Sequence, residues 1–112
     1  DLWFGLKNEF IISNIYAMCK QALYFNVCPL VGIPTPCFNM EEPNIIGENY
    51  QNRINQFQDN LMKFCSNKDI QYVDFNEGSL QAYFMEDGIH YNEKGHVFIM
   101  KKVVDKIKSL KE

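Results

Sequence analysis

The sequence predicts an α/β protein whose helices cover both faces of a parallel β-sheet, in three layers, α/β/α. Stretches with helical spacing of apolar residues alternate with short apolar runs in the order αβαβα, and a long loop follows each predicted strand. A hydrophobic content of 46% in 112 residues suits one globular domain at most. The order αβαβα is that of half a doubly wound sheet.

The first helix is predicted over residues 6–25. Its apolar residues recur at spacings of four, three and four: Ile11, Ile15, Met18 and Ala22. The run "CPLVGI" that follows is apolar throughout, which is typical of a parallel strand covered on both faces. Residues 34–49 begin with "PTP", contain three prolines and a glycine, and are predicted to form a long loop.

The most regular helical pattern covers residues 50–65. Its apolar positions alternate between spacings of four and three: Tyr50, Ile54, Phe57, Leu61 and Phe64. The stretch "DIQYVDF" predicts a second strand, and residues 76–91 a second long loop.

The last helix is predicted to begin after Asn92, which suits an N-cap, with Glu93 in the first turn where a carboxylate favours the helix dipole. Its lysines, from Lys101 to Lys111, are interpreted as a solvated face. The residues predicted to be buried are Val97, Met100, Val103, Val104, Ile107 and Leu110.

Two parallel strands do not make a stable sheet by themselves. We therefore expect either a homodimer or association with a missing portion of the domain to cover "CPLVGI".

The composition argues against nucleic acid as a partner and gives no sign of disulfide bonds or of a membrane span. A net charge of −3 without a basic stripe argues against nucleic acid. Cys19, Cys28, Cys37 and Cys65 have no CxxC spacing and are expected to be buried or half-buried thiols. No transmembrane segment or signal peptide is apparent, which favours the cytoplasm over secretion.

The loop before the last helix carries the candidate chemistry. Asp87 and His90 are three residues apart with Gly88 between them, so a tight turn can fold the carboxylate onto the imidazole Nδ1–H. That contact would leave Nε2 available as a general base.

"DGIHYNEKGH" resembles the last conserved block of the SGNH hydrolases, also called GDSL esterases/lipases. That block reads Asp-x-x-His and often continues as "DGIHPNxxGH"; Tyr91 stands where proline is common. "PLVGIPTP" is similar to the strand that precedes a long loop in that family. The resemblance implies a flavodoxin-like fold, a carboxylic ester hydrolase without a cofactor, and Asp87 and His90 as acid and base of a Ser-His-Asp triad. The implied substrates are small acyl esters, or acetylated sugars or lipids.

The nucleophile that the resemblance implies is not in this sequence. The family's "GDS" block, its later glycine and its "GxND" block are all missing. Residues 1–112 are therefore expected to be the C-terminal portion of one hydrolase domain, inactive alone. Of the four serines, only Ser79 lies near the predicted site, and a turn serine is the preferred interpretation.

Two other functions remain as alternatives. One is a metal-dependent hydrolase, because Asp87, His90 and His96, with Glu86 or Glu93, are residue types that bind zinc or iron. They lack the spacing of HExxH, which makes this the less favoured alternative. His96 is better interpreted as structural, at the helix start.

The other alternative function is that the chain is a non-enzymatic assembly module. Tyr83, Phe84 and Tyr91 are expected to pack in the core more readily than to line a substrate pocket.

Overall fold

The computed structural model describes residues 7–35 and 50–111. Its elements follow in the predicted order: helix α1 (Asn8–Tyr24), strand β1 (Leu30–Ile33), helix α2 (Tyr50–Asn67), strand β2 (Gln71–Asp74), the short 3₁₀ helix η1 (Gln81–Tyr83) and helix α3 (Glu93–Leu110). The two strands pair in parallel, with Leu30 opposite Gln71. The α/β class predicted from the sequence is confirmed.

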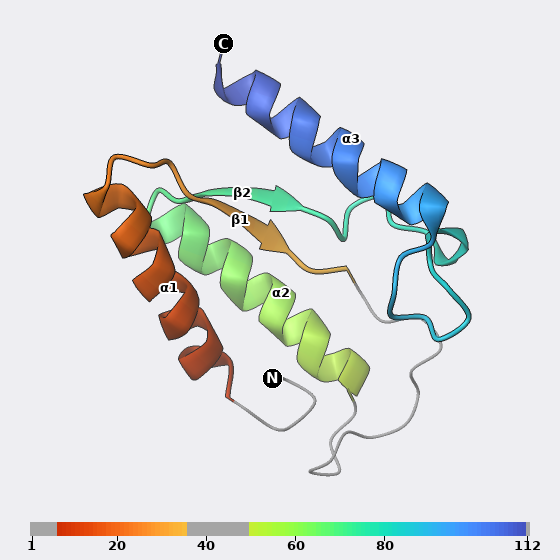
Figure 1. The fold of residues 1–112 in the computed structure, drawn as a ribbon. Helices are drawn as coiled ribbons and strands as arrows, with labels where there is room; N and C mark the ends of the chain where they lie inside the picture. Colours follow the sequence, from red (N-terminus) through yellow and green to blue (C-terminus); the bar gives the residue numbers. More distant parts are fainter. Residues whose placement is uncertain (1–6, 36–49, 112) are drawn as a thin grey trace.

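The elements form three layers (Figure 1), with α1 and α2 on one side of the sheet and α3 on the other. The hydrophobic core lies between the sheet and the first two helices. Its least exposed side chains are Ile33 of β1 and Leu61 and Cys65 of α2. The predicted helical spacing of α2 is confirmed at Ile54, Phe57 and Leu61, which are all buried, while Tyr50 has no described side chain.

Helix α1 packs through a different residue than its spacing predicts. Cys19 is its buried side chain, and Ile11 and Ile15 are half-buried against the core. Met18, predicted on the same face, is 62% exposed. Helix α1 packs on α2 and has no close contact with the strands among the described residues, so Met18 stays largely exposed.

Strand β1 is buried on one face only, which corrects the prediction of two covered faces. Val31 and Ile33 point into the core, while Leu30 is half-buried and Gly32 exposed. The strand also begins later than predicted, so Cys28 precedes it and is exposed, whereas Cys19 and Cys65 are buried thiols. Cys37 lies outside the described residues. Burial raises the pKa of the Cys19 and Cys65 thiols.

The prediction that an apolar face of α3 is buried is wrong. Of the six residues predicted to be buried, only Val103 is half-buried. The other five side chains are 41% to 55% exposed: Val97, Met100, Val104, Ile107 and Leu110. The helix packs on β2 and η1, and a sheet of two strands is too narrow to cover its remaining apolar face. Two lysines, Lys102 and Lys106, are half-buried instead of solvated. None of the described helices is long and apolar enough to span a membrane.

Candidate active site

The loop between β2 and α3 closes on itself just before the helix. Phe84 and Tyr91 form an antiparallel bridge, and the Met85 N–H donates to the His90 carbonyl at 2.8 Å. At the tip, the Gly88 N–H donates to the Met85 carbonyl, and Gly88 has a φ of 71°. A left-handed residue is needed there, and glycine adopts that conformation without steric cost. The loop therefore holds residues 86–89 in a tight turn.

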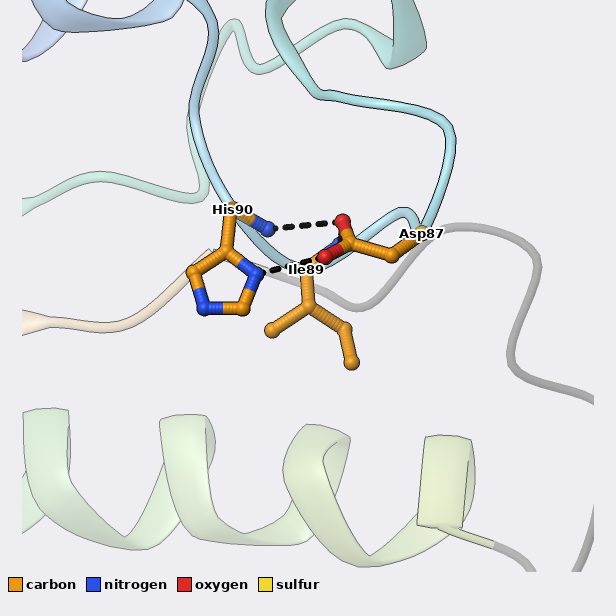
Figure 2. Close-up of polar contacts among 3 residues, drawn as sticks. All are labelled: Asp87, Ile89 and His90. Carbon is orange, nitrogen blue, oxygen red and sulfur yellow. Dashed lines mark hydrogen bonds and ion pairs between the residues drawn. The ribbon is translucent and has the colours of Figure 1, made fainter.

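Asp87 and His90 lie in contact within this turn (Figure 2). Asp87 Oδ1 accepts hydrogen bonds from the backbone N–H groups of Ile89 and His90, at 2.9 and 3.0 Å. The other carboxylate oxygen, Oδ2, lies 2.5 Å from His90 Nδ1. An ionised carboxylate only accepts hydrogen bonds, so Nδ1 must carry the proton. Nε2 then has no partner among the described residues and points away from Asp87.

The Asp87 carboxylate is stabilised in its charged form. Its pKa is lowered to about 2, chiefly by the hydrogen bond with His90 and further by the two backbone N–H groups. Both side chains are open to solvent, with 74% of His90 and 44% of Asp87 exposed. The Asp87 carboxylate is therefore ionised over the whole neutral pH range. It accepts the Nδ1–H of a His90 imidazole that is accessible to solvent.

We predict that the Asp87 carboxyl titrates with a midpoint near pH 2 in the folded chain, as measured by its carbon chemical shift in NMR. The folded pKa lies below the ordinary value of about 3.9. The contact therefore stabilises the fold above about pH 4, and this contribution is lost as the pH falls toward 2.

Replacing His90 by alanine should raise that midpoint, because the largest of the lowering contributions disappears. It should stay below the ordinary value, since both backbone N–H groups remain. Replacing His96 by alanine is the control and should leave the midpoint unchanged. An ordinary midpoint in the unmodified chain would show that the Asp87–His90 contact does not form in solution.

Two tertiary hydrogen bonds that the sequence did not reveal hold the segment after β1, one to this loop and one to α2. The Tyr91 hydroxyl donates to the Thr35 hydroxyl at 3.0 Å, which joins the loop after β2 to the loop after β1. Burial raises the Tyr91 pKa, and this hydrogen bond partly offsets that effect. Gln58, only 3% exposed, donates to the Pro34 carbonyl at 2.8 Å. The two loops therefore meet at Thr35 and Tyr91, while residues 36–49 of the first loop lie outside the described part.

Asn92 joins the loop to α3 as well as capping the helix. Its side-chain oxygen accepts from the Gly95 N–H at 2.9 Å, which confirms the predicted N-cap. Its amide group donates to the carbonyls of Ala82 and Phe84, at 2.8 and 3.2 Å. The same side chain therefore fixes η1 against the start of the helix, and the turn that carries His90 lies between these two anchors.

The remaining candidates have structural contacts. The Ser79 hydroxyl donates to the Asn76 carbonyl at 2.8 Å, as a turn serine does. His96 is exposed in the first turn of α3, with its ring 6.0 Å from that of Tyr91. Phe84 is buried against Tyr91, and Tyr83 stacks on Phe98. Within residues 7–35 and 50–111, no three His, Cys, Asp or Glu side chains come together as metal ligands.

Comparison with protein families matches residues 7–103 to the model described as GDSL-like lipase/acylhydrolase. No curated protein matches the chain.

Solved structures with the same fold include a GDSL-like lipase from Bacteroides thetaiotaomicron, with a TM-score of 0.77, 15% identity, and 95% of this chain and 55% of that one covered. A Bacteroides fragilis protein described as an acylhydrolase gives a TM-score of 0.78 and 17% identity, covering 95% and 54%. The esterase domain of the zebrafish ZfL2-1 retrotransposon ORF1 protein gives 0.75 and 14%, covering 95% and 62%. At these identities the likeness shows a shared fold and nothing more. This chain spans little more than half the length of the matched structures.

Proposed function

The chain belongs to the GDSL-like lipase/acylhydrolase family, and on that premise we propose that it supplies the acid and the base of a serine ester hydrolase. The observation that carries the proposal is the contact of Asp87 with His90 Nδ1, which leaves Nε2 accessible. This is the arrangement in which an imidazole acts as general base toward a hydroxyl nucleophile.

In the proposed reaction, His90 Nε2 takes the proton of a serine hydroxyl as its oxygen attacks the ester carbonyl. The imidazolium then gives that proton to the leaving alcohol, and the acyl group remains on the serine until water releases it. Asp87 keeps Nδ1–H directed toward itself and stabilises the imidazolium that forms. Its lowered pKa supports this role, because the carboxylate stays ionised at neutral pH.

The nucleophile is proposed to lie outside these 112 residues, in the remainder of a longer domain. The sequence contains no "GDS" block, and the one serine near the site, Ser79, uses its hydroxyl within a turn. This chain covers 55% and 54% of the two Bacteroides structures, so the remainder of each has no counterpart in these 112 residues. The bare apolar face of α3 also fits a domain from which packing partners are missing.

The proposal is tested with the full polypeptide that the gene encodes, beside the 112-residue chain. The full polypeptide should hydrolyse a p-nitrophenyl acyl ester and be labelled by a serine-directed fluorophosphonate, and the 112-residue chain should do neither.

Serine-dependent hydrolysis by the 112-residue chain would contradict the external nucleophile. A full polypeptide that hydrolyses no ester and takes no label would contradict the hydrolase proposal itself.

A further inference from the structure

The loop that carries His90 belongs to the α3 side of the molecule. Helix η1, from which this loop continues, packs on α3, and α3 in turn packs on β2. Among the described elements, neither η1 nor α3 makes a close contact with α1, α2 or β1. Packing within the α3 layer therefore does not by itself fix where the turn at residues 86–89 lies relative to α2 and β1.

Tyr91, which directly follows His90, makes a contact across this division. Its hydroxyl donates to the Thr35 hydroxyl at 3.0 Å, and both side chains are half-buried. Its ring packs against the buried Phe84, with the two ring centroids 4.9 Å apart, at the backbone bridge that closes the loop. Proline, which is common at this position of the resembling block, has no hydroxyl and could not make the contact with Thr35.

The Thr35 end of this contact is held by α2. Pro34 precedes Thr35, and its carbonyl accepts from Gln58 Nε2 at 2.8 Å. Gln58 is only 3% exposed, and a buried donor is costly to leave without its acceptor, so this hydrogen bond resists displacement. The two hydrogen bonds connect α2 to the residue beside His90, and we refer to them together as the α2–loop link.

We propose that Tyr91 and Thr35 are positioning residues for catalysis, because their hydrogen bond holds the His90 turn where Nε2 can reach the nucleophile. This inference rests on the proposed function and adds to it two residues that act through His90. A general base works only within hydrogen-bond reach of the proton that it takes, and a displacement of about 1 Å can lower a rate by roughly 10²-fold. Asp87 orients the imidazole within the turn, and the α2–loop link places the turn itself.

The separation of these two roles gives a signature that a general loss of structure would not produce. The contact of Asp87 with His90 lies within the turn, so it should survive when the α2–loop link is broken. The acid and the base would then be intact but displaced. The pH dependence of kcat/KM should keep its midpoint while the rate falls at every pH.

The test uses the full polypeptide and a p-nitrophenyl ester. Tyr91→Phe removes the donor and keeps the ring, and Thr35→Val removes the acceptor and keeps the shape of the side chain. Each should lower kcat roughly 10- to 100-fold and change KM by no more than a few-fold. The double variant should be no slower than either single variant, because both changes remove the same hydrogen bond. Thr35→Ser keeps a hydroxyl and should stay within a few-fold of the unmodified protein.

Tyr83→Phe is the matched control. It removes a tyrosine hydroxyl from the same loop, its ring can still stack on Phe98, and its rates should be unchanged. Thermal unfolding of each variant sets an assay temperature at which all are folded. In the 112-residue chain, a nuclear Overhauser effect between the Tyr91 ring and the Thr35 methyl group should show the contact without any catalytic activity.

Failure of this inference is distinguishable from failure of the proposed function. An unmodified full polypeptide that hydrolyses no ester would contradict both. In an active polypeptide, the positioning role alone is overturned if Tyr91→Phe and Thr35→Val are as fast as the unmodified protein, or if their losses add. It is also overturned by a Thr35→Ser variant as slow as Thr35→Val, by losses confined to KM or to thermal stability, or by a shifted pH midpoint. Absence of the Overhauser effect would show that the two loops are not joined in solution.

Discussion

Replacing His90 by alanine in the full polypeptide is expected to lower kcat/KM for ester hydrolysis by roughly 10⁴-fold or more. Its Nε2 is the proposed proton acceptor, and the described residues around the turn offer no second imidazole in the same place. His96, the other histidine of the chain, lies in the first turn of α3 against Tyr91. Steady-state rates on a p-nitrophenyl ester measure the effect.

The matched control is His96→Ala, which removes an exposed imidazole from the same block and should change kcat/KM by no more than a few-fold. Asp87→Asn separates orientation from charge. An asparagine oxygen can still accept from the N–H groups of Ile89 and His90, so the turn should persist. His90 would lose its negatively charged partner, and a loss of roughly 10² to 10⁴ is expected. Equal rates for His90→Ala and the unmodified protein would exclude His90 as the base.

Replacing Gly95 by alanine is expected to destabilise the chain by about 3 kcal/mol, although alanine for glycine in a helix ordinarily stabilises by about 1 kcal/mol. A Cβ at position 95 would overlap the backbone carbonyl oxygen of Tyr83 and lie 2.9 Å from the Tyr91 ring. Neither group is free to move, because the same Tyr83 carbonyl accepts from the Asn92 N–H at 3.0 Å. Urea unfolding measures the loss.

Lys94→Ala is the control, one residue earlier on the exposed surface of α3, and should stay within about 0.5 kcal/mol of the unmodified chain. Hydrogen exchange gives a second, local readout. If Gly95→Ala pushes η1 away from the helix, the Asn92 amide should lose protection while amides in α2 keep theirs. A Gly95→Ala chain as stable as the original would show that the approach of Tyr83 is looser than described.

The features that the sequence predicted well depend on neighbours close along the chain. The helical spacing of α2, the N-cap at Asn92 and the glycine turn at Gly88 are each set within a few residues. The contact of Asp87 with His90 was predicted for the same reason. Its catalytic role was inferred from a family resemblance, and it stays a proposal.

The features that the sequence did not reveal depend on distances across the fold. Apolar spacing identified one face of α3, but the sheet beneath it is too narrow, so those residues are exposed. Lys102 was assigned to solvent, and its ammonium instead reaches a strand carbonyl 28 residues earlier. Thr35 and Tyr91 are 56 residues apart, and no local pattern could pair their hydroxyls. Residues 36–49, which form most of the first predicted loop, lie outside the described part.

The turn that joins Asp87 to His90 has a consequence for how a complete enzyme would assemble. Partners three residues apart close a very short loop, so bringing them together costs little chain entropy and needs no distant segment. The proposed acid and base are thus brought together by local contacts alone. Catalytic competence would then depend on one rigid-body relation, the placement of this preformed pair against a serine held by another part of the protein.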